Sequence, residues 1–123
     1  MKESRLASIA SKAVAATLRE LPADIRKAAR AVPVSLEAAP GPDVLSDGFE
    51  PDILGLFVGN PVGSELSGGD PSPPRIHLYT SNLWDYAEED VEAFRDEVRL
   101  TYLHELGHYL GWDEDQLTAR GLD

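Results

Sequence analysis

The chain has 123 residues, no cysteine and a net charge of −11, from 22 acidic and 11 basic residues. The length predicts a single domain over residues 1–123. Without cysteine there is no disulfide and no thiolate metal site. The acidic balance without a basic stripe argues against nucleic-acid binding. No apolar run suits a signal sequence or a membrane span, so we expect a soluble, cytoplasmic protein that does not bind membranes.

The first half of the chain predicts two helical segments and a strand. Apolar residues recur at helical spacing over residues 3–20, and the Leu21-Pro22 step ends that pattern. Residues 25–31 predict a second helix or a continuation of the first. Residues 32–37 alternate between apolar and polar side chains, which is typical of a strand. Residues 38–50 are rich in Pro, Gly and Asp, and we expect a loop there.

The second half predicts two more strands and a long helix. Residues 53–58 form a short apolar strand, and residues 75–80 alternate as a strand. Glycines and prolines predict a long loop over 61–74, acting as either a lid or a connector. Residues 81–87 are expected to connect the last strand to the long helix. This order favours an α+β fold with a small sheet packed on helices.

The long helix carries the most informative motif of the chain, His104-Glu105-Leu106-Gly107-His108. Histidines four residues apart lie on one face of a helix, so both can bind one Zn²⁺. Glu105 then lies beside the metal and can act as general base toward a water molecule. The apolar positions of the same helix recur every three or four residues: Val91, Phe94, Val98, Tyr102, Leu106 and Tyr109, widened by Leu103 and Leu110.

A third metal ligand is expected just after Gly111, which predicts the end of the helix. In HExxHxxGxxH sites the third ligand stands three residues after the glycine, which here is Glu114. Asp113 is the alternative, and Asp115 is also near. The same acidic residues are equally suited to capping a short last helix over 115–120, and capping and ligation can coexist.

Other polar side chains have weaker claims to a role. Tyr79, Tyr102 and Tyr109 are candidate oxyanion donors, although Tyr102 and Tyr109 lie on the apolar stripe and favour core packing. His77 is better interpreted as an exposed strand histidine than as a catalytic group.

From Ile53 to Leu117 the chain resembles the minimal bacterial zincin-like metallopeptidases, formerly a domain of unknown function. The resemblance rests on Leu54 to Gly59, on Pro74 to Tyr79, on Glu97-Val98-Arg99 and on the block from His104 to Leu117. It implies a minimal zincin-like fold, with a small sheet packed against an N-terminal helix and an active-site helix, and no separate C-terminal subdomain. The family often has Asp at the position of Glu114.

The motif and the resemblance together predict a zinc metallopeptidase that cleaves peptide or protein substrates. We expect Glu105 to be the general base, His104, His108 and Glu114 to bind Zn²⁺, and residues 75–80 to form the sheet edge that holds the peptide. Two alternatives remain open. One is a metal-binding protein without significant hydrolysis, and the other is an interaction module that retains the motif. Glu105, which has no ligand role, favours catalysis over both.

Overall fold

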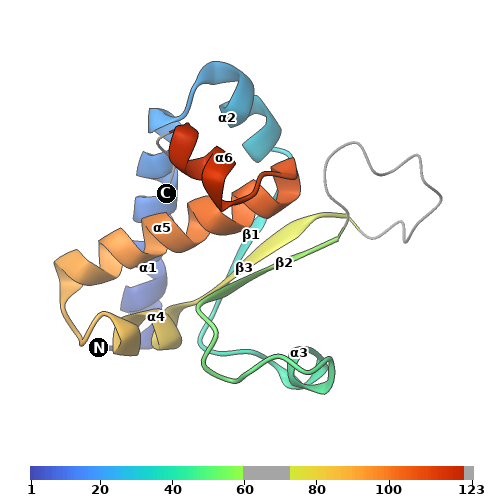
Figure 1. The fold of residues 1–123 in the computed structure, drawn as a ribbon. Helices are drawn as coiled ribbons and strands as arrows, with labels where there is room; N and C mark the ends of the chain where they lie inside the picture. The colour runs from blue at the N-terminus through green and yellow to red at the C-terminus, as the bar shows by residue number, and fades with distance from the viewer. Residues whose placement is uncertain (60–72, 121–123) are drawn as a thin grey trace.

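The computed structural model describes residues 1–59 and 73–120, and it is an α+β fold with a three-stranded mixed sheet (Figure 1). The predicted loop over 61–74, with its interpretation as a lid or connector, lies almost wholly outside these residues. The helices are α1 (Glu3–Glu20), α2 (Ala23–Ala29), α3 (Pro42–Ser46), α4 (Thr80–Tyr86), α5 (Val91–Leu110) and α6 (Glu114–Ala119), and the strands are β1 (Val34–Glu37), β2 (Gly55–Val58) and β3 (Arg75–Tyr79). Within the described residues, no helix is both long and apolar enough to span a membrane.

The sheet has the order β1-β3-β2, with β3 parallel to β1 and antiparallel to β2. The expectation that residues 75–80 form the sheet edge is therefore wrong. Hydrogen bonds to a neighbour on each side make β3 the central strand, and its Ile76, Leu78 and Tyr79 are fully buried. The prediction had relied on closeness along the chain to the long helix, which does not determine the lateral order of strands.

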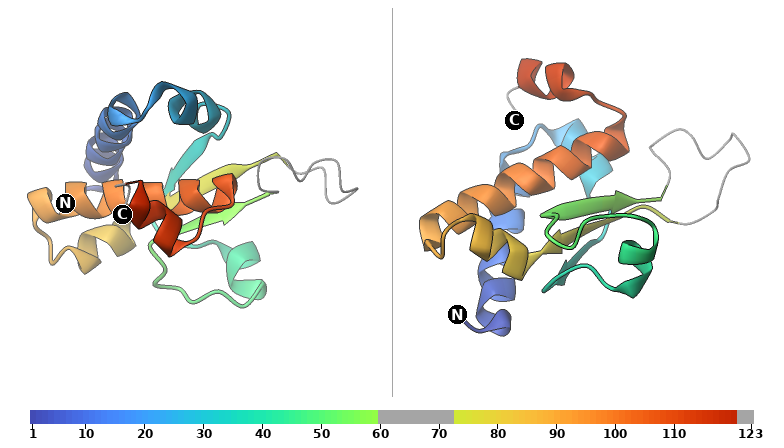
Figure 2. Two further views of the ribbon diagram at one scale, coloured as in Figure 1. Left: turned by 45° about the horizontal axis from the view of Figure 1, so that its top comes forward. Right: turned by 60° about the horizontal axis from the view of Figure 1, so that its bottom comes forward.

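Helices α1 and α5 pack against each other, and α5 also crosses strands β2 and β3 (Figures 1 and 2). The apolar stripe of α5 meets the sheet face that carries Ile76 and Leu78, while α3 lies on the side of the sheet away from α5. The core joins buried residues of both helices to this sheet face: Leu6, Ala10 and Val14 of α1, and Phe94, Val98, Tyr102 and Leu106 of α5. The predicted pattern of the long helix is confirmed.

Two helices occupy segments for which the sequence predicted none. The loop expected over 38–50 contains α3, which begins with Pro42, a residue whose fixed φ suits a first helical position. The expected connector over 81–87 is helix α4, which starts at Thr80. Glu3 of α1 accepts hydrogen bonds from the hydroxyls of Thr80 and Ser81, so the first helix is tied to the start of α4 across most of the chain.

The residues at the two ends of α5 have the features that favour helix termini. Asp90 caps α5 by accepting a hydrogen bond from the Ala93 N–H at 2.8 Å. Gly111 ends the helix with a left-handed φ of 74°, as its position predicted, because glycine adopts this conformation without strain. The helix is therefore held at both ends, and its last two turns carry His104, Glu105 and His108.

Candidate active site

The two histidines of the motif lie as a shared metal site requires. Their Nε2 atoms are 3.2 Å apart, and the ring centroids are separated by 4.8 Å. Two nitrogens bound to one tetrahedral zinc at about 2.0–2.1 Å are separated by roughly 3.3 Å. The ligand atoms of His104, Glu105 and His108 all lie within 4.8 Å of one another. The fold thus brings together the chemical groups that fit a divalent metal ion.

Glu105 lies between the helix and the edge of the sheet and is only partly exposed. Burial raises the pKa of its carboxyl above the ordinary value, whereas positive charge on His108 and His104 and a hydrogen bond from the backbone N–H of Phe57 act to lower it. The carboxylate therefore lies close to both imidazoles and to the backbone of β2.

A cavity of about 320 Å³ adjoins the motif, with His104 and Glu105 in its wall. Its remaining lining comes from the start of β2 and from the helical turn that precedes the histidines: Leu54, Gly55, Leu100 and Thr101. A Cβ at Gly55 would come within 2.7 Å of the Thr101 methyl group, so glycine allows β2 to approach α5 this closely. Neither Gly55 nor Thr101 was singled out from the sequence, although a glycine inside an apolar strand is a recognised sign of close backbone approach.

The third predicted ligand falls in a region that the structure describes only in part. Glu114 begins α6, but its side chain lies outside the described atoms, so its role as a metal ligand stays a prediction. Asp113, the alternative ligand, caps α6: its Oδ1 accepts from the Gln116 N–H at 2.8 Å, and Gln116 Oε1 accepts from the Asp113 N–H at 2.9 Å. The predicted capping role of the acidic segment is thus confirmed for Asp113, and the helix begins one residue earlier than expected.

The tyrosines named as oxyanion candidates are all buried. Tyr102 and Tyr109 belong to the core, as their position on the apolar stripe indicated. Tyr79 is fully buried, and its hydroxyl has no hydrogen-bond partner among the described residues. Burial, followed by the negative charges of Glu37 and Glu105, raises the pKa of Tyr79. A buried phenol cannot reach a substrate without movement, so we assign no oxyanion role to these residues.

His77 is not the exposed histidine that the sequence predicted. It is half-buried, its Nδ1 lies 2.6 Å from Glu37 Oε1, and its ring stacks on that of Tyr79. Because side chains alternate along a strand, His77 and Tyr79 point away from the face on which Leu78 meets α5. His77 therefore stands apart from the group formed by His104, Glu105 and His108.

A long helix thus crosses a small mixed sheet and carries a His-Glu-His group beside β2, which pairs with no second strand among the described residues. A family model described as a zincin-like metallopeptidase matches residues 29–122. The chain therefore belongs to the family of zincin-like metallopeptidases. A search of curated proteins found no match to this chain.

Proposed function

We propose that this protein is a zinc-dependent peptidase whose active site is formed by His104, Glu105 and His108. The observation that carries the proposal is the 3.2 Å separation of the two histidine Nε2 atoms beside a partly buried glutamate. Membership of the zincin-like metallopeptidase family supports the same reaction class. We propose Glu114 as the third ligand, because Asp113 is engaged in capping α6.

Glu105 has the position that a general base needs. A zinc ion held by the two histidines would supply Lewis-acid activation of the scissile carbonyl and of a water molecule. Glu105 then accepts the proton of the attacking water and delivers it to the leaving amine. The hydrogen bond from the Phe57 N–H holds the carboxylate at β2, within 4.8 Å of the histidine ligand atoms, so the base is positioned before substrate arrives.

The outer edge of β2 is the surface that suits the substrate backbone. The Leu54 carbonyl accepts a hydrogen bond from Tyr79 N–H at 3.0 Å, so Leu54 points its polar groups toward β3. The backbone N–H and C=O groups of successive residues in an antiparallel pair point alternately toward and away from the partner strand. Gly55 and Phe57 therefore point these groups away from β3. Within the described residues β2 pairs with no strand on that side. An extended peptide can therefore pair with the carbonyls of Gly55 and Phe57 and with the N–H of Gly55.

The cavity beside Glu105 suits an apolar side chain of the substrate. Leu54 and Leu100 supply apolar walls, and the described lining contains no basic residue except His104. We propose that a residue next to the scissile bond inserts an aliphatic side chain here. A peptide library should show enrichment of Leu, Ile, Val or Met at one position next to the cleaved bond, and Leu100→Arg should shift that preference toward acidic residues.

The decisive experiment compares the wild-type protein with Glu105→Gln on a denatured protein substrate. Both proteins are loaded with zinc, and the metal content of each is measured. We expect equal zinc content, with cleavage by the wild type reduced at least about 100-fold in the variant, because loss of a general base costs at least this much. Equal cleavage by the two proteins would overturn the proposal. If both bind zinc and neither cleaves a broad set of substrates, the protein is instead a metal-binding protein without hydrolytic activity.

A further inference from the structure

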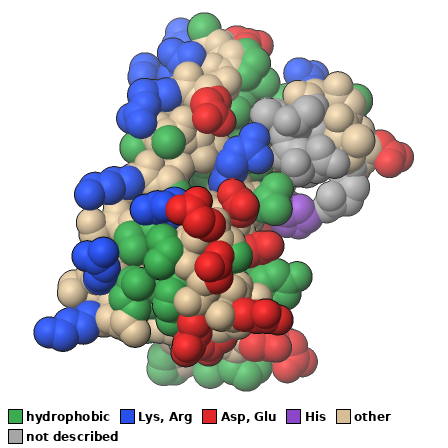
Figure 3. All heavy atoms as spheres, turned by 90° about the vertical axis from the view of Figure 1, so that its left-hand side faces the viewer, with side chains coloured by type: hydrophobic (Ala, Val, Ile, Leu, Met, Phe, Trp, Pro, Cys, Tyr) green, Lys and Arg blue, Asp and Glu red, His purple; other side chains and the backbone are tan. Residues whose placement is uncertain are grey.

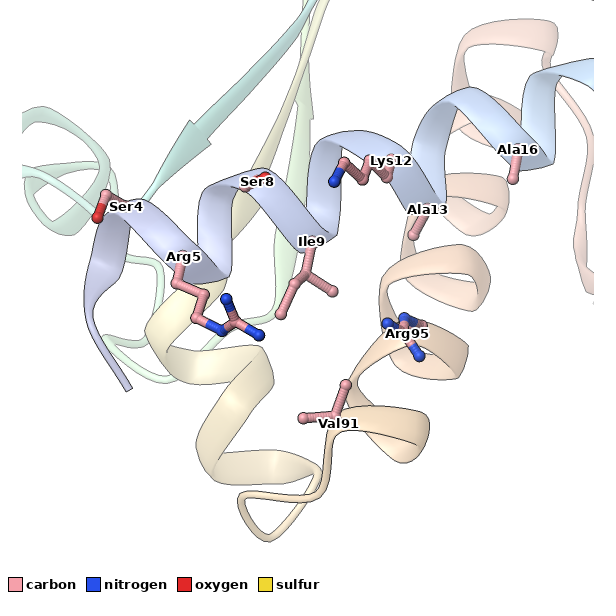
Figure 4. A pocket seen from close by; sticks show the side chains of 9 residues that line it. All are labelled: Ser4, Arg5, Ser8, Ile9, Lys12, Ala13, Ala16, Val91 and Arg95. Atoms are coloured by element: carbon pink, nitrogen blue, oxygen red, sulfur yellow. The ribbon is translucent and has the colours of Figure 1, made fainter.

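A second concave surface lies away from the histidines, between α1 and the first turns of α5. This groove has a volume of about 500 Å³ (Figure 4). Figure 4 shows Ile9 of α1 and Val91 of α5 directed into the space between the helices. We call it the α1–α5 groove. Most of its lining belongs to residues before position 29, which the family model does not match.

The floor of the α1–α5 groove is apolar and is left partly uncovered by the fold. Ile9, Ala13 and Val91 line it and are only half-buried, because the apolar face of α1 is wider than the surface that α5 covers. The lining residues run from Ser4 to Ala16 along α1, which corresponds to roughly 18 Å of helix. A groove of this length accommodates about three turns of a partner helix.

The α1 side of the α1–α5 groove is basic in a chain that is strongly acidic. Arg5, Lys12 and Arg95 line the groove, and no acidic residue does. Arg95 forms an ion pair with Glu92 at 2.8 Å, whereas the described part of the chain offers Arg5 and Lys12 no carboxylate partner. On the side of the molecule where α5 begins, Figure 3 shows Lys and Arg mostly along the left margin, Asp and Glu mainly through the middle and lower part, and hydrophobic side chains exposed between them.

We propose that the α1–α5 groove binds an acidic amphipathic helix of a partner protein. The apolar floor receives the hydrophobic stripe of that helix, and Arg5 and Lys12, about 10 Å apart along α1, pair with acidic residues two helical turns apart on the partner. A second copy of this chain fits less well, because it would bring its whole net charge of −11 to the groove, whereas a short acidic helix brings only the few charges that face Arg5 and Lys12. The proposal concerns a surface distinct from the active site and does not depend on peptidase activity.

The test uses a fluorescently labelled synthetic helix of about 14 residues, with leucines on one face and glutamates beside them. The full-length protein is titrated into this peptide, and binding is followed by fluorescence anisotropy. We expect the double variant Arg5→Glu/Lys12→Glu to weaken binding at least about tenfold, because two attractive contacts become repulsive. The matched control is Lys27→Glu/Arg30→Glu, which makes the same change in net charge at exposed positions outside the groove. That control is expected to weaken binding by less than about threefold.

Two further peptides separate the apolar and the charged contributions. A peptide with glutamines in place of the glutamates should bind more weakly, and so should a peptide of identical composition whose leucines no longer share a face. The proposal is overturned if the scrambled peptide binds as well as the original, if both double variants weaken binding equally, or if no peptide binds. Concentration-dependent association in analytical ultracentrifugation that Arg5→Glu/Lys12→Glu abolishes would assign the groove to a second copy instead.

Discussion

The carboxylate of Glu105 on α5 accepts a hydrogen bond from the backbone N–H of Phe57 on β2. This contact joins the helix that carries the metal-binding motif to the strand whose outer edge is open within the described residues. The Phe57 N–H in this contact is one of the backbone donors on the outer edge of β2. Under the proposed mechanism, the general base and a bound peptide would therefore both be positioned by this strand.

Zinc should stabilise the wild-type protein and not the histidine variants. Binding to the folded state alone raises the free energy of unfolding by about 2.7 kcal/mol when free zinc is about 100 times Kd. We expect the thermal midpoint of the wild type to rise with zinc, and that rise to be lost in His104→Ala and in His108→Ala. The measurement is thermal unfolding with zinc and with EDTA. A rise of equal size in either variant would mean that the ion binds elsewhere.

The third ligand can be tested on the acidic residues around the start of α6. Glu114→Ala should weaken zinc binding by about tenfold or more, since a missing ligand leaves only two protein groups on the metal. Asp115→Ala should change zinc affinity little, and Asp113→Ala should mainly loosen the N-terminus of α6. Competition with a chromophoric chelator measures these affinities. If Asp113→Ala weakens binding more than Glu114→Ala does, the assignment of the ligand is wrong.

The close contact between β2 and α5 predicts a coupled pair of substitutions. Gly55→Ala places a methyl group 2.7 Å from Thr101 Cγ2 and 3.0 Å from the His77 carbonyl oxygen, and overpacking of this kind costs about 1–3 kcal/mol. Thr101→Ser removes the first of these contacts, so the double variant should recover part of the loss. Urea denaturation of both single variants and the double variant gives the coupling free energy. A strictly additive result would show that the two residues do not meet.

The turn between α4 and α5 contains two residues with left-handed backbones, Glu88 with φ 57° and Glu89 with φ 61°. This conformation costs an ordinary residue about 1 kcal/mol, which glycine does not pay. Glu89→Gly should therefore stabilise the protein by up to about 1 kcal/mol, because the greater chain entropy of glycine offsets some of the gain. Glu89→Gln is the control for the lost charge. Chemical denaturation that finds the glutamine variant at least as stable as the glycine variant would contradict this explanation.

The burial of the Tyr102 hydroxyl predicts that the protein loses stability at high pH. Burial raises the pKa of its hydroxyl from 10.0 to about 12. The unfolded chain therefore releases this proton at a lower pH than the folded protein does. The contribution of the Tyr102 hydroxyl to the free energy of unfolding is complete below about pH 10 and is lost as the pH rises toward 12. Tyr102→Phe should unfold with a smaller dependence on pH over this window. Equal pH dependence of the urea midpoint in the two proteins would contradict the assignment.

The helices and strands that carry the site could be predicted because their signals are local. The apolar period of α5 and the glycine at position 111 each depend on residues within a few turns of one another. The short helix α3 was missed because it lies in a segment rich in Pro, Gly and Asp, a composition that favours a loop, and α4 was missed because it follows β3 with no residue between them. The start of α4 is held by contacts such as that of Glu3 with Ser81, which link distant parts of the chain.

By itself, the sequence determined that His104 and His108 lie together, since their spacing places both rings on one helical face whatever surrounds the helix. Only the tertiary structure decided which strand lies beside them. It placed β3 at the centre of the sheet and β2 at the edge beneath Glu105, because strand order follows from hydrogen bonding and burial between segments far apart in the chain. The same long-range packing left the basic groove between α1 and α5 open.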